Sequence, residues 1–305
     1  MDFLIFTISM GVLIYGADFI VEQSEKIALH YNISQFIIGA TLVALGTSLP
    51  EMAISMSASM KGSADIAVAN VIGSTIFNIS LVLGVVFIVA KNVNSKRDIF
   101  AKDSAWGLFP IFIFILMGLD GQLNRVDGIL FIMLMLAYLL FIIQDHQVDE
   151  HSIEDREKFN WLKSGSLLLL GFAFVIVGAD FAIESAGNIA RMFGISEWLI
   201  GLFLVAFGTS LPELTVSIKA AIEGKAEMSI GAIIGSNVAN FTMVLGLSSI
   251  VNPLNVDFSA YLFDIMAAVI LSIMLVFITA NKMYNKSAGV VLLIVLVLVI
   301  QNSLA

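Results

Sequence analysis

Ten stretches of this chain are apolar for long enough to cross the hydrocarbon core of a bilayer, which is about 30 Å thick. Apolar residues make up 59% of the sequence and charged residues only 13%, which excludes an ordinary soluble domain. The runs are continuous and do not alternate polar with apolar residues, so helices are expected and barrel strands are not. We therefore predict an all-α integral membrane protein with ten transmembrane helices. The predicted spans are 3–21, 33–60, 64–90, 104–119, 126–144, 164–183, 195–222, 226–251, 258–280 and 287–304.

The basic residues predict how these spans are oriented. Of the 15 Lys and Arg, all but three fall in loops that follow odd-numbered spans, and the exceptions are Lys61, Arg125 and Arg191. Cytoplasmic loops carry the excess of Lys and Arg in membrane proteins, so both termini are predicted to lie outside. Five spans in each half then make the two halves inverted with respect to each other. We expect a multi-pass protein of the cell (inner) membrane.

An internal repeat supports this division into halves. Residues 39–51 (GATLVALGTSLPE) return as 201–213 (GLFLVAFGTSLPE), 162 positions later and identical at ten of thirteen positions. The same offset relates 16–19 to 178–181, 72–74 to 234–236, and Asn78 to Asn240. We predict a first repeat at 1–144, a short acidic cytoplasmic loop at 145–163 and a second repeat at 164–305.

Each copy of the repeat places oxygen-bearing side chains on one helix face. Ala44, Thr47, Ser48 and Glu51 are spaced i, i+3, i+4 and i+7, and Ala206, Thr209, Ser210 and Glu213 repeat that spacing. Proline cannot donate to the carbonyl four residues back, so Pro50 and Pro212 are expected to release main-chain oxygens in the middle of each span. On the next span, Ser74 with Asn78, and Ser236 with Asn240, add further oxygens.

Carboxylate, hydroxyl and carbonyl oxygens are the ligands that calcium and sodium prefer. Small polar residues in membrane helices often serve packing alone. A glutamate at mid-membrane, however, must be protonated, paired with a cation or exposed to water, and here the glutamate is duplicated. Asp18 and Asp180 are also repeated but lie near span ends, where we expect structural roles. His30, His146 and His151 lie in loops or at their edges, and no catalytic or metal role is expected for them.

The GTSLPE motif occurs twice, and each copy is followed by a GS-x-x-x-N pattern. This arrangement resembles the two repeats of the sodium/calcium exchanger family, in its compact prokaryotic form. The resemblance implies antiport of calcium against sodium at one site that opens alternately to the two sides. It further implies calcium ligands at Glu51 and Glu213, with backbone oxygens at Thr47 and Thr209, and a gating role for spans 1 and 6. Potassium-dependent members carry aspartate where this chain has Asn240, which argues against potassium coupling. The residues implied to bind sodium or line the site are Ala44, Ser48, Ser74, Asn78, Ala206, Ser210, Ser236 and Asn240.

Three alternatives remain open at this point. A calcium/proton antiporter of the same fold would protonate the two glutamates, although the neutral serine oxygens favour sodium. An intramembrane enzyme is disfavoured because no histidine lies within a span, and a passive channel would not couple two ions. We expect no cofactor, and the expected partners are the transported Ca²⁺ and Na⁺ and the lipid bilayer, with no nucleic acid and no implied protein partner.

Overall fold

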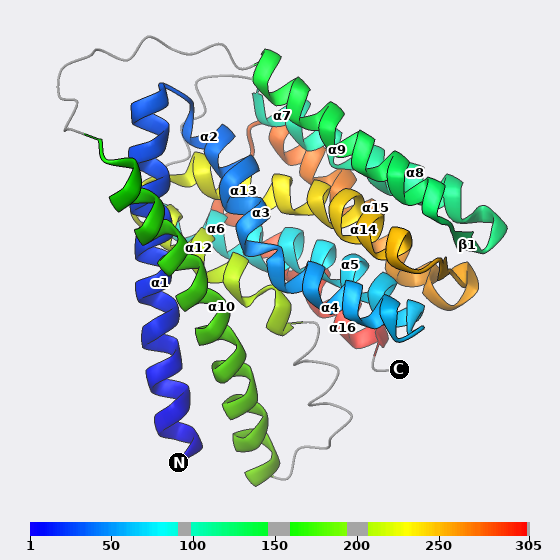
Figure 1. The fold of residues 1–305 in the computed structure, drawn as a ribbon, viewed down its shortest axis with the longest axis horizontal. Coiled ribbons are helices and arrows are strands. Elements are labelled where there is room, and N and C mark those ends of the chain that lie inside the picture. Colours follow the sequence, from blue (N-terminus) through cyan, green and yellow to red (C-terminus); the bar gives the residue numbers. More distant parts are fainter. Residues whose placement is uncertain (91–98, 146–158, 194–206, 304–305) are drawn as a thin grey trace.

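The computed structural model describes residues 1–90, 99–145, 159–193 and 207–303 (Figure 1). The first half contains α1 (Asp2–Tyr31), α2 (Gln35–Ile38), α3 (Ala44–Thr47), α4 (Leu49–Met60), α5 (Ala64–Phe77), α6 (Gly84–Val89), α7 (Ile99–Trp106), α8 (Leu108–Met117) and α9 (Arg125–Asp145). The second half contains α10 (Trp161–Met192), α12 (Leu211–Ile222), α13 (Ala226–Ala239), α14 (Leu245–Val251), α15 (Phe258–Ala280) and α16 (Lys286–Ser303). Apart from helices, the described residues contain only two two-residue strands, β1 (Gln122–Leu123) and β2 (Leu254–Asn255), which form an antiparallel pair.

Local sequence explains where several of these helices begin and end. Ser34 caps α2 by accepting a hydrogen bond from the amide of Ile37, and Asp257 caps α15 through the amides of Ser259 and Ala260. Asn32 ends α1 in a left-handed conformation with φ 55°, which asparagine tolerates better than most residues. Short π-helical turns at Gly39–Val43, Asn78–Leu83 and Asn240–Val244 join α2 to α3, α5 to α6 and α13 to α14.

Seven helical segments among the described residues are long and apolar enough to cross a membrane. The predicted span 33–60 appears as a pair of helices bent by 43° between Thr47 and Leu49, and the last predicted span is a shorter apolar helix, Lys286–Asn302. The predicted span 195–222 lies only partly within the described residues. The structure therefore agrees with an all-helical membrane protein, while the count of ten spans remains a prediction.

The helices that follow the motif have the same boundaries in the two halves. α4 and α12 are related by the 162-residue offset of the sequence repeat, and so are α5 and α13. Gly62 (φ 74°) and Gly224 (φ 81°) occupy equivalent turns after α4 and α12, where the left-handed conformation favours glycine. The duplicated sequence has thus kept the same local structure in both copies.

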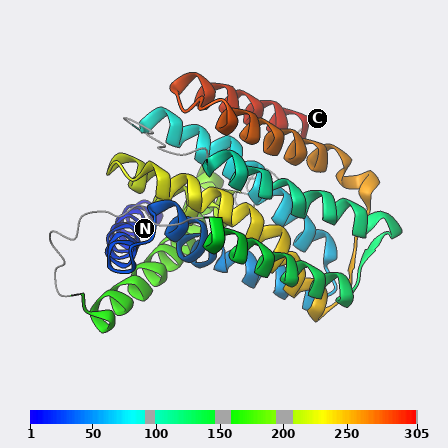
Figure 2. The ribbon, with the colours of Figure 1, turned by 90° about the horizontal axis from the view of Figure 1, so that it is seen from above.

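Helices α1 and α10 lie side by side and form a unit distinct from the other helices, which we call the α1–α10 pair (Figure 1). In the view from above, α1 is seen nearly end-on, whereas α13 and α15 are seen from the side (Figure 2). The largest apolar cluster lies among the other helices and includes Phe114, Phe131 and Phe241. Separate, smaller clusters join the α1–α10 pair to this core through residues such as Val21 and Val216.

Glycines allow the two helices of the pair to approach closely. A Cβ added at Gly16 of α1 would lie 2.8 Å from the carbonyl oxygen of Gly171 in α10, and one at Gly178 would lie 2.9 Å from the amide nitrogen of Leu13. Small residues of this kind are typical of tightly packed membrane helices. The contact is between backbones, so neither side can yield by rotating a side chain.

We therefore predict that Gly16→Ala lowers the stability of the fold by about 1–3 kcal/mol, the usual effect of overpacking. Gly11→Ala, on the same helix, is the matched control, because no atom lies within 4 Å of a Cβ added there. Thermal melting in detergent micelles, followed by circular dichroism, measures both. Equal melting temperatures for the two variants would mean that the α1–α10 contact is looser than described.

Candidate functional site

The GTSLPE motif breaks its helix in both halves at the residue before the leucine. Ser48 (φ −83°, ψ 7°) separates α3 from α4, and Ser210 (φ −87°, ψ 2°) directly precedes α12. The prolines occupy the first turn of the new helix, where a missing amide hydrogen leaves no helical bond unmade. The helix is thus interrupted at both copies of the motif, while the release of main-chain oxygens by Pro50 and Pro212 stays a prediction.

This break puts each glutamate in the first turn of a helix. Glu51 and Glu213 are the third residues of α4 and α12, where the amide groups of the helix N-terminus favour negative charge. The glutamates are 0% and 2% exposed, which places two carboxylates in the interior of an apolar protein. Ser48, three residues before Glu51, contacts Glu213, so the two carboxylates belong to one buried site, where two negative charges favour a cation.

Several oxygens at this site have no hydrogen-bond partner among the described residues. Both carboxylate oxygens of Glu51 and Oε2 of Glu213 are buried without a partner. The same is true of Oγ of Ser210 and the side-chain oxygens of Asn78 and Asn240. Buried polar atoms nearly always have partners in native proteins. A set of unsatisfied oxygens that includes two carboxylates therefore fits a bound cation.

Hydrogen bonds connect the two halves of the chain at this point. Ser48 Oγ donates to Glu213 Oε1 at 3.3 Å, and Ser236 Oγ donates to the carbonyl oxygen of Ala44 at 3.4 Å. The hydroxyls of Ser74 and Thr209 are 3.4 Å apart, and the amide of Asn78 donates to Asn237 Oδ1 at 3.2 Å. Each of these contacts joins one repeat to the other, so neither repeat forms the site alone.

The structure brings together most of the residues that the sequence selected. Those that are buried and contact the other half directly are Ala44, Ser48, Ser74, Asn78, Thr209, Glu213 and Ser236. Thr47, Glu51, Ser210 and Asn240 are also buried, and Thr47 donates its hydroxyl within its own helix to Val43 at 3.1 Å. Ala206 lies outside the described residues.

The residues predicted to be structural make none of the hydrogen bonds described above. Asp18 forms an ion pair with Lys219 but lies near the middle of α1 rather than near its end, because α1 continues to Tyr31. Asp180 makes no ion pair among the described residues. His30 lies in the last turn of α1, which extends ten residues beyond the predicted span, and its ring stacks on Phe159. His146 and His151 lie outside the described residues.

Helix α10 crosses both copies of the motif, which the sequence did not predict. The glycine before each threonine faces this helix: Gly46 contacts the ring of Phe172, and a Cβ added at Gly208 would lie 2.6 Å from Cδ1 of Ile183. Phe172 and Ile183 are eleven residues apart, about three helical turns, and therefore lie on one face of α10. The glycines of GTSLPE thus make room for the helix that covers the site.

Two buried asparagines near the site were also missed. Asn237 accepts the hydrogen bond of Asn78, and Asn70 of α5 donates to Ser55 Oγ at 2.9 Å and to the carbonyl oxygen of Glu51 at 3.3 Å. Asn237 stands next to Ser236 in an apolar run and could have been selected for that reason. Asn70 has no polar counterpart in the second repeat, where Ala232 occupies the equivalent position. A comparison of the two repeats therefore could not select Asn70.

The ligand chemistry of the site is limited to oxygen. Within the described part of the chain no group of three or more His, Cys, Asp or Glu could hold a metal ion. Two carboxylates with surrounding hydroxyl, amide and main-chain oxygens instead fit hard cations that bind and leave, which is what a transported ion must do.

Comparison with known proteins identifies the family. The sodium/calcium exchanger protein model matches residues 1–144 and 163–304, nearly the whole chain. The chain belongs to this family. It is accordingly a multi-pass membrane antiporter, and the family is one of transporters and not of enzymes, in agreement with the sequence prediction.

Individual relatives are similar over most of their length. The sodium/calcium exchanger MaX1 of Methanosarcina acetivorans is 30% identical, with 96% of this chain and 95% of MaX1 covered. An uncharacterized membrane protein of Methanocaldococcus jannaschii is 38% identical over 80% of each chain. A solved structure of the sodium-calcium exchanger NCX_Mj superposes with a TM-score of 0.85 at 34% identity, covering 98% of both chains. A more distant relative, 27% identical over 84% of this chain and 80% of its own, is the Ca²⁺/H⁺ antiporter ChaA of Bacillus subtilis.

The contact of Asn70 with the first turns of α4 can be tested directly. Asn70→Ala removes the amide that joins Ser55 to the carbonyl of Glu51, so we expect the free energy of unfolding to fall by about 1–3 kcal/mol. Ser55→Ala and the double variant complete a mutant cycle by thermal melting. Asn281→Ala, which removes an exposed hydrogen bond to Phe277, is the control. Strictly additive effects of the Asn70 and Ser55 substitutions would show that the pair is not coupled.

Proposed function

We propose that this protein exchanges Ca²⁺ for Na⁺ across the membrane by alternating access, with Glu51 and Glu213 as the calcium-binding carboxylates. The observation that carries the proposal is the set of buried oxygens without partners around two glutamates, one from each repeat. In this proposal the main-chain oxygens of Thr47 and Thr209 complete the calcium site. Sodium uses the same glutamates and the oxygens at Ala44, Ser48, Ser74, Asn78, Ala206, Ser210, Ser236 and Asn240.

Charge balance explains why the two ions would exclude each other. Two ionised glutamates neutralise one Ca²⁺ or two Na⁺, and excess charge in a low-dielectric interior is strongly unfavourable. Because the ions share these ligands, one must leave before the other binds. Any sodium beyond two per calcium would make transport sensitive to voltage, by about 2.3 kcal/mol per charge per 100 mV.

The architecture we propose is ten transmembrane helices in two inverted five-helix repeats, 1–144 and 164–305, joined by the cytoplasmic loop 145–163. The equivalent boundaries of α4 with α12 and of α5 with α13 support the duplication. The ion pairs that join the C-terminal half of α1 to the end of α12 and the turn after it support the placement of these segments on one side of the membrane. The distribution of Lys and Arg makes that side the cytoplasm and leaves both termini outside a cell (inner) membrane.

A second candidate is calcium/proton antiport at the same two glutamates. Similarity to the antiporter ChaA favours it, because a fold shared with that protein accommodates proton coupling. The neutral hydroxyls of Ser48, Ser74, Ser210 and Ser236 favour sodium, since a proton carried on a carboxylate needs no further oxygen ligands.

The coupling ion can be identified by calcium uptake into proteoliposomes. We expect vesicles loaded with sodium and diluted into sodium-free buffer to accumulate calcium, because sodium leaving down its gradient drives the exchange. Matched vesicles without the sodium gradient, or with a proton gradient in its place, are the controls. Uptake driven only by protons would transfer the protein to calcium/proton exchange, and no gradient-dependent uptake would refute calcium antiport.

The site assignment is tested by neutralising each carboxylate. Glu51→Gln and Glu213→Gln should each reduce calcium uptake at least about 100-fold, since one remaining carboxylate cannot balance a divalent ion in a dry interior. Glu184→Gln, an exposed glutamate of α10, should transport normally. Gel filtration and thermal melting confirm that each variant is folded. Full activity of either site variant would exclude that glutamate as a calcium ligand.

A further inference from the structure

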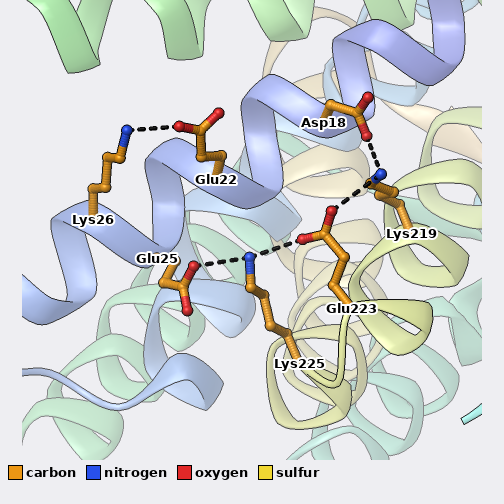
Figure 3. A network of polar contacts seen from close by, with 7 residues as sticks. All are labelled: Asp18, Glu22, Glu25, Lys26, Lys219, Glu223 and Lys225. Atoms are coloured by element: carbon orange, nitrogen blue, oxygen red, sulfur yellow. Dashed lines mark hydrogen bonds and ion pairs between the residues drawn. The ribbon is translucent and has the colours of Figure 1, made fainter.

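A network of ion pairs fastens the C-terminal half of α1 to the end of α12 and the turn that follows it (Figure 3). Lys219 pairs with Asp18 of α1 and, at 3.0 Å, with Glu223. Lys225 lies 2.8 Å from both Glu25 of α1 and Glu223. We call these five residues the ion-pair latch. Glu223 links its two lysines, so the two connections to α1 form one continuous network.

The helix held by this network belongs to the unit that covers the site. Besides the glycine contacts, an aromatic cluster joins α1 to the start of α10: His30 stacks on Phe159, and Trp161 Nε1 donates to the hydroxyl of Tyr31 at 2.5 Å. A force on α1 is therefore transmitted to α10, which crosses both copies of GTSLPE. The ion pairs between α1 and α12 therefore also hold α10 in place against the two motifs.

The residues of the latch are not duplicated by the internal repeat. Under the 162-residue offset Asp18 corresponds to Asp180, but Lys219 corresponds to Ser57 and Lys225 to Ser63, so the lysines have no equivalent. Glu223 corresponds to Lys61, which reverses the charge. The equivalent position on the opposite face therefore cannot form this network, although the surrounding backbone is duplicated.

The strength of the latch suits a contact that must open repeatedly. The Lys219, Asp18 and Glu223 side chains are about one-third exposed, and ion pairs in such settings are individually weak. Burial tends to lower the pKa of Lys225, but hydrogen bonds to Glu223 and Glu25 raise it above its ordinary value, so the lysine stays charged. Several weak bonds in one network can bias two conformations without trapping either one.

We propose that the ion-pair latch closes the face of the transporter at the α12–α13 turn, the predicted cytoplasmic face, and biases the resting antiporter toward access from the other side. The inference rests on alternating access in the proposed function. It adds a built-in asymmetry to a duplicated fold: opening toward the cytoplasm must break Asp18–Lys219 and Glu25–Lys225, whereas the positions equivalent to the two lysines are serines and cannot form these pairs.

Thiol labelling tests the latch without requiring transport. The chain has no cysteine, and Ala220 of α12 is buried in the apolar cluster that joins α12 to α1, so Ala220→Cys places one probe beneath the latch. In this background Lys219→Gln with Lys225→Gln should raise the rate of modification by a charged maleimide about two- to tenfold, the range expected for two exposed ion pairs. A high concentration of choline chloride should screen the ion pairs and so raise the labelling rate of the parent protein. The same salt should change the labelling rate of the glutamine variant less.

Two controls separate the latch from general loosening of the fold. Lys26→Gln breaks the ion pair with Glu22, which lies in the same region but within α1, and should leave labelling unchanged. Lys219→Arg with Lys225→Arg keeps both charges and should retain slow labelling. Equal labelling rates in the glutamine pair, the Lys26 variant and the parent would overturn the latch. Because labelling does not depend on ion flux, a failure of calcium uptake would refute the proposed function and leave this result interpretable.

Discussion

The structure depends on burying two carboxylates in the interior of a membrane protein without a basic partner among the described residues. Glu51 and Glu213 are almost completely inaccessible, and three of their four oxygens have no hydrogen-bond partner in the described chain. Such an arrangement is unfavourable unless a cation binds, a proton is taken up or water enters. Each glutamate lies in the first turn of a helix, and the partial positive charge of the helix N-terminus offsets part of this unfavourable free energy but not all of it. A site left in need of positive charge is suited to a protein that carries cations.

The same need explains why the site is built between two repeats. One glutamate alone would balance a single sodium ion, whereas two glutamates balance a calcium ion, and the duplication supplies the second at an equivalent position. The hydrogen bonds of Ser48 to Glu213 and of Ser236 to the Ala44 carbonyl then interlock the repeats, so that the ligands of one half are positioned by the other. Close packing of α13 on the π-helical turn of the first half, where Gly235 contacts the backbone of Ala40, brings these groups within reach.

Symmetry of the site and asymmetry of its surroundings serve different purposes. The oxygens of the candidate site are duplicated almost residue for residue. The ion pairs that hold α1 against α12 are not duplicated, because Lys219 and Lys225 have serines at their equivalent positions. Asn70, which bonds to α4 beside Glu51, likewise has an alanine at its equivalent position. Two inverted halves with identical surroundings would open equally to both sides. Unequal ion pairs at the two faces are a simple way to favour one direction of access while the binding site itself stays unchanged.

The sequence by itself determined the bilayer environment, the helical class and the principal candidate ligands. Long apolar runs permit only helices, because backbone groups must be satisfied within each segment in lipid, and the repeated GTSLPE selected Glu51 and Glu213 by the penalty of placing a charge there. Only the tertiary structure decided that Ser48 contacts Glu213, that α10 crosses both motifs, and that Asp18 and Glu25 pair with lysines some two hundred residues away. Helical periodicity assigns residues to the faces of one helix, whereas contacts between helices depend on crossing angles and on the small residues that set their separation. Asn70 and the lysines of the latch lie in this second category, because their partners come from other helices and the repeat has no equivalent of these residues.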